Sequence, residues 1–319
     1  MKMLIACALA YGVTHLLTPV SMGLARRIGA VDIPRDWRRM HQNAVPRAGG
    51  TAIVFGLLIA FTVLGYGESN RFALGVGCIG LCVMGLIDDV LCLGAGIKLL
   101  VQAGIVVGTV WASGMRGGFA VAGVLWVLTL VNAHNMIDGL DGLLTGCVAI
   151  EGSALSVVLL MLGFPNSDIA ALVVLACLGF LPYNRHPAKT FAGDCGSESL
   201  GFLMGILSLP LLRAFHGIGA FTPIFLFAYP LTDLGAAISR RLLRGKSPFC
   251  ADRGHLHHRI FDAGVDHEGC TAVLLTLTGA LCVTGVFICN PRLWGAAAVA
   301  CLLSAGLLVC LRGYVLKKS

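Results

Sequence analysis

Carboxylates, amides and histidines recur in four short clusters, each beside an apolar segment. The first cluster, 85–89, ends in the adjacent carboxylates Asp88 and Asp89. Two neighbouring acids directly after an apolar run are costly unless a cation, a hydrogen-bond donor or a proton compensates them. This pair therefore indicates a site, with a helix end in contact with water as the alternative interpretation.

Polar residues in the segment 132–142 recur every three positions, as Asn132, Asn135, Asp138 and Asp141. Such a row drifts around the axis of a regular helix, so one narrow face cannot hold all four. The glycines of this segment allow a break or tight turn that would bring the last three residues to a common cavity. A plain loop would be unusually rich in oxygen donors and apolar residues at once, so the row favours function.

The third cluster places glycines on both sides of Asp194 in the segment 191–202. A helix that begins here presents free backbone N–H groups and a positive dipole end, both suited to phosphate, and Ser197 or Ser199 is able to cap it. The alternative is an ordinary turn with Asp194 as its cap, which the density of glycines disfavours.

The fourth cluster contains His255, His257 and His258, flanked by Arg253 and a second arginine, within the long basic loop 240–269. Three histidines in four residues suit zinc, but zinc sites usually need further partners. Beside arginines they are better placed to donate hydrogen bonds to phosphate oxygens. A basic loop that contacts anionic lipid headgroups is the alternative.

A fifth segment, 32–50, is basic and suited to the phosphate of a lipid, with a topology signal as the alternative; its candidate ligands are Arg38, Arg39, His41 and Arg47. Taken together, carboxylate and amide oxygens suit Mg²⁺, with Mn²⁺ as a second choice, because Mg²⁺ binds few protein ligands and shares its shell with substrate phosphates. The combination predicts phosphoryl transfer between a soluble diphosphate and a lipid.

The elements that carry these clusters are membrane helices. The chain is 57% hydrophobic and 12% charged, against about 45–50% and about 25% in soluble domains. A soluble chain of 319 residues cannot bury this excess, so it must face lipid. We expect an all-α, polytopic membrane protein forming one domain over 1–319, with about 11 transmembrane helices. The apolar runs are 3–23, 48–65, 72–87, 97–114, 119–136, 143–162, 167–183, 198–212, 218–239, 270–289 and 293–312.

The formal charge of +7 is explained by cytoplasmic loops rather than by nucleic acid, because all but five of the 23 basic residues fall in alternate loops or the C-terminus. The positive-inside rule then makes the N-terminus periplasmic and the C-terminus cytoplasmic, in a bacterial inner membrane. All but three of the 16 acids lie on the same side, which predicts a polar site facing the cytoplasm. The exceptions are Lys2, Arg71, Arg116, Arg213 and Arg292, and Glu68, Glu151 and Asp168.

The ordered set of clusters resembles the polyprenyl-phosphate N-acetylhexosamine-1-phosphate transferases of glycosyltransferase family 4, which are related to the phospho-N-acetylmuramoyl-pentapeptide transferases. The segment 32–50 is similar as well, so the resemblance spans nearly the whole chain. The order His-Leu-His-His in 255–258 resembles the branch that makes undecaprenyl-diphosphate-GlcNAc. The family's reaction is Mg²⁺-dependent transfer of an N-acetylaminosugar-1-phosphate from a UDP-sugar to undecaprenyl phosphate. It releases UMP and is the first membrane step of O-antigen or another cell-surface polysaccharide.

The resemblance also implies roles for matching positions. Asn135 and Asp194 would be ligands of Mg²⁺, and Asp88 and Asp89 the catalytic pair that positions or deprotonates the lipid phosphate. Asp138 and Asp141 would line the nucleotide pocket. The histidines of the fourth cluster, together with its first arginine, would grip the diphosphate. A homodimer is an open alternative to a monomer.

One position departs from the family, because members of the GlcNAc branch often carry an acid where this chain has Cys92. The sugar is therefore open among GlcNAc, GalNAc, FucNAc and QuiNAc. An ion-coupled membrane transporter is the alternative from another class, but such sites usually lie near the bilayer midplane. A CDP-alcohol phosphotransferase would show Asp-Gly-x-x-Ala-Arg, and the segment 138–143 lacks the Ala-Arg.

Overall fold

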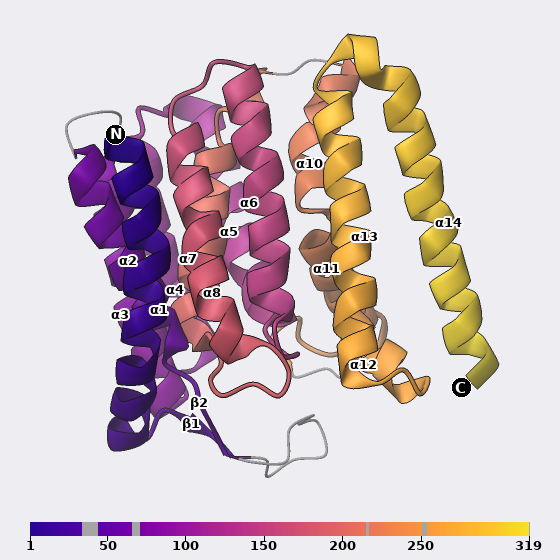
Figure 1. Cartoon of the computed structure of the whole chain (residues 1–319). Coiled ribbons are helices and arrows are strands. Elements are labelled where there is room, and N and C mark those ends of the chain that lie inside the picture. The colour runs from indigo at the N-terminus through magenta and orange to yellow at the C-terminus, as the bar shows by residue number, and fades with distance from the viewer. Residues whose placement is uncertain (34–43, 66–70, 215–216, 251–253, 319) are drawn as a thin grey trace.

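The computed structural model describes residues 1–33, 44–65, 71–214, 217–250 and 254–318, with side chains as far as 306. The described chain is a bundle of roughly parallel and antiparallel helices (Figure 1). Its elements are α1 (Lys2–Ile28), β1 (Val31–Asp32), β2 (Val45–Pro46), α2 (Gly49–Leu64), α3 (Arg71–Leu91), α4 (Ala95–Ala112), α5 (Gly117–Ile137), α6 (Leu143–Met161), α7 (Ser167–Asn184), α8 (Gly193–Ser208), α9 (Leu211–Ala214), η1 (Gly217–Phe221), α10 (Thr222–Leu226), α11 (Ala228–Leu243), α12 (Leu256–Asp262), α13 (His267–Ile288), η2 (Pro291–Leu293) and α14 (Trp294–Lys318).

The helix α8 forms the centre of the bundle. It packs against α2, α3 and α5, and nearly all of its residues are buried. Small residues allow this close packing, since a side chain at Gly205 would meet Val127 of α5 and one at Gly50 of α2 would meet Gly196. The N-terminus of α8 is thereby enclosed by three other helices, which makes it the place where their polar side chains can meet.

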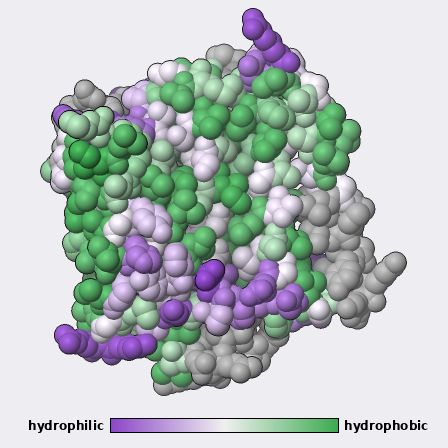
Figure 2. All heavy atoms as spheres, viewed as in Figure 1, coloured by the Kyte–Doolittle hydropathy of each residue, from purple (hydrophilic) through white to green (hydrophobic). Residues whose placement is uncertain are grey.

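The outer surface of the bundle is apolar, as a membrane protein requires. Figure 2 shows hydrophobic residues over most of the visible flank and hydrophilic ones gathered mainly along one edge. Large apolar side chains on several helices are more than 60% exposed, among them Leu4, Leu16, Phe72, Leu100, Leu125, Leu160 and Leu302. The prediction of an all-α polytopic membrane protein is confirmed by these helices.

All eleven predicted apolar runs contain helix, but they are not equally long. The described residues hold eight helices long and apolar enough to cross a membrane, or nine if the pair Gly217–Leu226 and Ala228–Leu243 is one span. That pair is bent by 80° at Phe227, although the run 218–239 was expected to be one helix. The reason is Pro230, which has no N–H group and would clash with the Leu226 carbonyl in a continuous helix.

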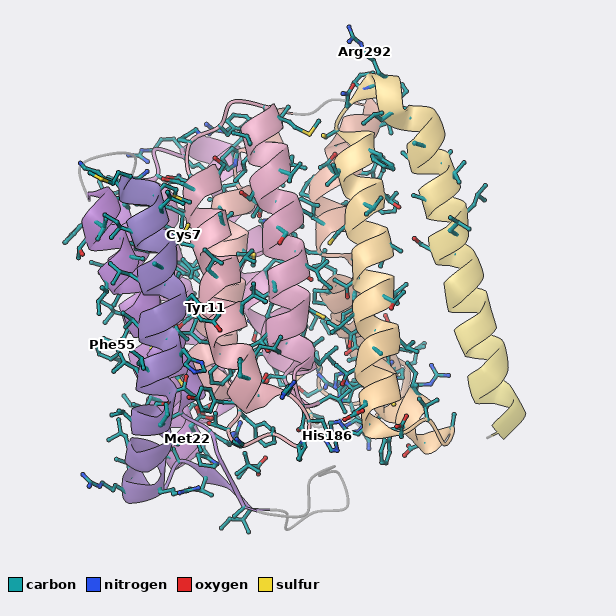
Figure 3. All side chains as sticks on the ribbon, viewed as in Figure 1. Cys7, Tyr11, Met22, Phe55, His186 and Arg292 are labelled. Carbon is teal, nitrogen blue, oxygen red and sulfur yellow. The ribbon has the colours of Figure 1, made fainter. Side chains whose placement is uncertain are left out.

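The two ends of the bundle differ in their polar residues. Figure 3 places Arg292 at one end and His186 at the other, and Figure 1 places the N- and C-termini at opposite ends. At the end opposite to His186, Arg71 pairs with Asp168 at 2.8 Å. Glu151 belongs to neither end: it is fully buried and pairs with His134 at 2.8 Å. The sequence left that residue open between a buried pair and the site.

Candidate active site

The carboxylate of Asp89 closes the N-terminus of α8. It accepts hydrogen bonds from the backbone N–H groups of Asp194 (3.2 Å) and Cys195 (3.4 Å). An anion at this position satisfies free amides and complements the helix dipole. The sequence suggested Ser197 or Ser199 as the cap of this helix. Neither serine caps it, because both are buried within the helix. The amides expected to bind phosphate are thus partly occupied by Asp89.

Arg47 joins the first and third clusters. Its guanidinium lies 3.3 Å from Asp89 and 3.2 Å from Asp194. Burial disfavours its charge, but these two carboxylates raise the pKa of Arg47 above its usual value. Arg47 was predicted to bind a lipid phosphate; the structure places it among the acids. The other predicted lipid ligands, Arg38, Arg39 and His41, lie outside the described residues.

Lys98 and Glu198 lie in the same group of charged side chains as Asp88, Asp89 and Asp194, and these side chains together are called the acid cluster below. The sequence alone had not indicated a role for Lys98 or Glu198. The Lys98 ammonium lies 2.9 Å from Asp88 and 2.7 Å from Glu198, and it also contacts Asp194. A signal was present, because Lys98 is the single charged residue of α4, and Glu198 follows Asp194 by one helical turn. Charged groups inside membrane helices are rare and usually functional.

The row 132–141 spreads around the end of α5, as its spacing predicted. Asn132 donates to Gln102 of α4 (3.1 Å), whereas Asn135 donates to Ser197 of α8 (3.0 Å). The helix ends at Ile137, and the Asp138 carboxyl lies near the backbone N–H of Gly193 and the Arg47 guanidinium, which both favour its charged form. Asn135 and Asp138 therefore join the acid cluster, and Asn132 does not.

Asp141, the last residue of the row, turns away from the acid cluster. Its carboxylate contacts His186 Nδ1 at 2.8 Å and the Ala188 N–H at 2.9 Å, both in the loop between α7 and α8. It lines a pocket of about 650 Å³ together with Arg185 and Lys189. Asp138 and Asp141 were expected to share one cavity; the structure points them to neighbouring but different places.

The predicted basic loop 240–269 contains a short helix, α12, which places its histidines next to the segment 132–141. His255 donates to Asp233 of α11 at 2.7 Å and anchors the start of this helix. A side chain at Gly139 would meet the His257 ring, so glycine there allows the two segments to touch. The rings of His257 and His258 are in contact, with centroids 4.3 Å apart and planes tilted by 46°. Arg253 lies outside the described residues.

Among the described residues, the acid cluster has more acidic than basic side chains. Five carboxylates, from Asp88, Asp89, Asp138, Asp194 and Glu198, face two basic side chains. Burial raises the pKa of Asp138 to about 7, in spite of the opposing charge of the nearby guanidinium. An excess of buried carboxylates that share one ammonium is a suitable environment for a divalent cation with oxygen ligands. The residues present therefore fit Mg²⁺.

Cys92 directly follows the last residue of α3 and lies three positions after Asp89. It adopts a left-handed conformation with φ 52°, and its side chain is exposed. The next residue, Leu93, donates its N–H to Asp88 at 2.6 Å. This turn holds the first aspartate beside α4, and the Cys92 side chain takes no part in the cluster.

Replacement of Gly193 by Ala is expected to damage the site. Gly193 has φ +68°, and a β-carbon would overlap the Arg47 carbonyl and the Asp89 carboxylate. We expect the melting temperature in detergent to fall by roughly 5–10 °C, because both backbone strain and overpacking contribute. Gly245→Ala is the control, since its φ is +65° with nothing within 4 Å. Equal losses in the two variants would show that the close approach to Arg47 is unimportant.

The stability of the protein is expected to fall in mild acid through His257. Burial lowers the pKa of His257 from 6.5 to about 3, so the folded protein binds fewer protons than the unfolded chain between these values. The free energy of unfolding therefore decreases as the pH falls below 6.5, by roughly 1–2 kcal/mol at pH 5. His257→Gln should show a shallower decline in melting temperature between pH 7 and pH 5. Identical slopes would contradict this origin.

Comparisons with known proteins show which family and which relatives the chain resembles. The sequence model of glycosyl transferase family 4 matches residues 71–211, from α3 to the start of α9. The chain is 34% identical over 300 residues to a probable undecaprenyl-phosphate N-acetylglucosaminyl 1-phosphate transferase of Bacillus subtilis, covering 88% of this chain and 83% of the relative. It is 31% identical to the undecaprenyl-phosphate alpha-N-acetylglucosaminyl 1-phosphate transferase of Escherichia coli K12 (81% and 76% covered). It is 32% identical to the decaprenyl-phosphate N-acetylglucosaminephosphotransferase of Mycobacterium tuberculosis (92% and 85% covered).

Proposed function

Because the chain belongs to glycosyl transferase family 4, we propose that it transfers an N-acetylaminosugar-1-phosphate from a UDP-sugar to undecaprenyl phosphate. An oxygen of the lipid phosphate would attack the sugar-linked phosphorus, and the bond to UMP would break. The observation that carries this proposal is the contact of Lys98 with Asp88 and Asp194 at the N-terminus of α8, next to the histidines of α12. Phosphoryl transfer depends mainly on positioning and charge stabilisation, which such a cluster can provide.

The cation is proposed to be Mg²⁺, or alternatively Mn²⁺, held by Asp194 and by the side-chain oxygen of Asn135. The Asn135 Nδ2 group already donates a hydrogen bond to Ser197, which fixes the orientation of the Asn135 amide. Bound there, the ion would neutralise charge on the diphosphate and polarise the phosphorus. Lys98 is then free to move from the carboxylates to a phosphate oxygen.

The two aspartates of the catalytic pair receive different tasks. Asp89 has a fully buried side chain bound to Arg47 and to two amides of α8, so it positions the guanidinium and the helix. Asp88 has a side chain 12% exposed and reaches Lys98. We therefore place Asp88 next to the lipid phosphate, where it can orient this nucleophile or accept its proton.

The donor is proposed to lie between the acid cluster and α12. Its diphosphate would be gripped by His255, His257 and His258, with Arg253 from the adjoining loop. The pocket of about 650 Å³ beside Asp141 is large enough for the nucleoside. Neutral histidine can donate one hydrogen bond to an anionic oxygen without the cost of a buried charge.

The site is proposed to face the cytoplasm of a bacterial inner membrane. Eight long spans, the bent pair, α2 and α14 would together make eleven crossings, with the N-terminus periplasmic and the C-terminus cytoplasmic. The basic residues support this orientation, since most lie at the end that holds the site. The product would start an O-antigen or another cell-surface polysaccharide.

A panel of UDP-sugars tests the proposal directly. The protein, purified in detergent, is mixed with undecaprenyl phosphate, Mg²⁺ and UDP-linked GlcNAc, GalNAc, FucNAc or QuiNAc. We expect release of UMP with at least one donor, a lipid product whose mass identifies the sugar, and loss of both on chelation by EDTA. CDP-linked donors serve as the control. No UMP from any UDP-sugar, or faster reaction with CDP donors, would overturn the assignment, and cation-driven uptake into vesicles would support a transporter instead.

A further inference from the structure

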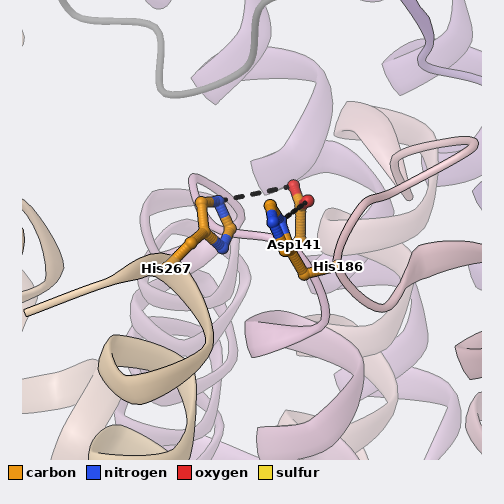
Figure 4. Close-up of side chains that lie close together, drawn as sticks. All are labelled: Asp141, His186 and His267. Atoms are coloured by element: carbon orange, nitrogen blue, oxygen red, sulfur yellow. Dashed lines mark hydrogen bonds and ion pairs between the residues drawn. The ribbon is translucent and has the colours of Figure 1, made fainter.

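A second group of convergent ligands lies apart from the acid cluster. Figure 4 shows the Asp141 carboxylate, just before α6, joined by dashed lines to His186 of the α7–α8 loop and to His267 of α13. Asp141 Oδ2 lies 2.8 Å from His186 Nδ1, and Asp141 Oδ1 lies 3.7 Å from His267 Nε2. One ligand atom from each residue lies within 4.8 Å of the others. Neither histidine has a part in the proposed transfer reaction.

The three side chains are held in place by their surroundings. The Ala188 N–H fixes the Asp141 carboxylate at 2.9 Å, and Thr271 of α13 donates to the Asp141 carbonyl at 3.2 Å. The rings of His186 and His267 stack with centroids 4.3 Å apart and planes within 22°. Outer-shell hydrogen bonds of this kind orient metal ligands and raise their affinity.

The ligand set is that of a zinc-class ion rather than of Mg²⁺. Two imidazoles and one carboxylate suit Zn²⁺, whose bonds of about 2.0–2.2 Å in a tetrahedron separate the ligand atoms by roughly 3.3–3.5 Å. The distances of 2.8 and 3.7 Å bracket this separation, so small rotations of the side chains would complete the site. The His186 side chain is 38% exposed, which provides a route for the ion.

We propose that Asp141, His186 and His267 bind one transition-metal ion of the zinc class, with its fourth position open to the adjoining pocket. The ion would fasten together the start of α6, the α7–α8 loop and the start of α13, which are far apart in the sequence. The site is chemically distinct from the acid cluster, since its ligands and its preferred metal both differ, and it borders the pocket proposed for the nucleoside.

Metal titration of the tag-free full chain, without donor and with Mg²⁺ present to occupy the acid cluster, tests this site. Co²⁺ is the probe, because its visible absorption reports tetrahedral nitrogen and oxygen ligands, and Zn²⁺ is then added as a competitor. We expect one equivalent of Co²⁺ to bind, Zn²⁺ to displace it, and Zn²⁺ to raise the melting temperature. His186→Gln and His267→Gln should each weaken binding at least tenfold, and melting curves without metal show whether these variants fold.

Two controls locate the site. His15→Gln removes a histidine of α1 whose Nδ1 contacts the Gly179 carbonyl at 3.1 Å, and His257→Gln tests the histidines of α12. Both should bind Co²⁺ as the wild type does. Absence of saturable binding, unchanged binding in His267→Gln, or loss of binding in His257→Gln would each overturn the proposal. UMP release with Mg²⁺ is measured separately, so failure of the metal site leaves the transferase assignment untouched.

Discussion

Replacement of Asp194 by Asn is expected to lower UMP release at least about a thousandfold, the largest effect of any substitution considered. The carboxylate of Asp194 is contacted by both Arg47 and Lys98, and it is the proposed ligand of the divalent cation. An amide of the same size keeps the packing but offers no charge to any of these three groups. Turnover is measured at saturating UDP-sugar and Mg²⁺, with melting curves to confirm folding.

Asp168→Asn is the matched control for this variant. Asp168 also pairs with an arginine, at 2.8 Å from Arg71, but at the opposite end of the bundle. The same change of charge there should leave turnover within about twofold of the wild type, because this pair lies at the end of the bundle away from the candidate site. Similar losses in both variants would point to a general effect on the fold, and full activity of Asp194→Asn would remove this residue from the mechanism.

Loss of the ammonium group in Lys98→Met is expected to lower turnover by at least about a hundredfold and to destabilise the metal-free protein. Asp88, Asp194 and Glu198 would then lie close together with one counter-charge fewer. Removing one partner of a buried charge group costs roughly 3–5 kcal/mol, which corresponds to a fall of roughly 5–10 °C in melting temperature.

Mg²⁺ distinguishes this explanation from simple unfolding. In Lys98→Met the ion should raise the melting temperature by more than it does in the wild type, because it replaces the missing positive charge. Lys246→Met is the control, since Lys246 is exposed at the end of α11. A variant with normal activity, or one whose melting temperature does not respond to Mg²⁺, would contradict the role given to Lys98.

Local sequence was sufficient to find most of the candidate site. The spacing of three between Asn132, Asn135 and Asp138 predicted a row that drifts around a helix, and the structure shows the first of them turned to α4 instead of α8. The helix break after Ile137 was also predicted, from glycines alone. These features depend on helical periodicity and backbone freedom, which are properties of a short segment.

Other features depend on partners distant in the sequence. Lys98 was read as one basic loop residue among many, because nothing in the sequence states that α4 lies over Asp88 and Asp194. In the same way, Asp141 belongs to a regular row of polar residues, yet His186 and Ala188 determine where its carboxylate points. Partner choice in such cases is decided by the packing of the whole bundle.

The shortness of α2 has a consequence for the surrounding lipid. Its 16 residues measure about 24 Å, less than the roughly 30 Å of a hydrocarbon layer. The helix cannot slide to share this deficit between both leaflets, because the Gly49 and Gly50 N–H groups are tied to the loop before α8 at 3.1 and 2.9 Å. As one of the proposed crossings, α2 would draw the neighbouring headgroups inward, so a long-chain carrier would present its phosphate to the protein where the membrane is thinnest.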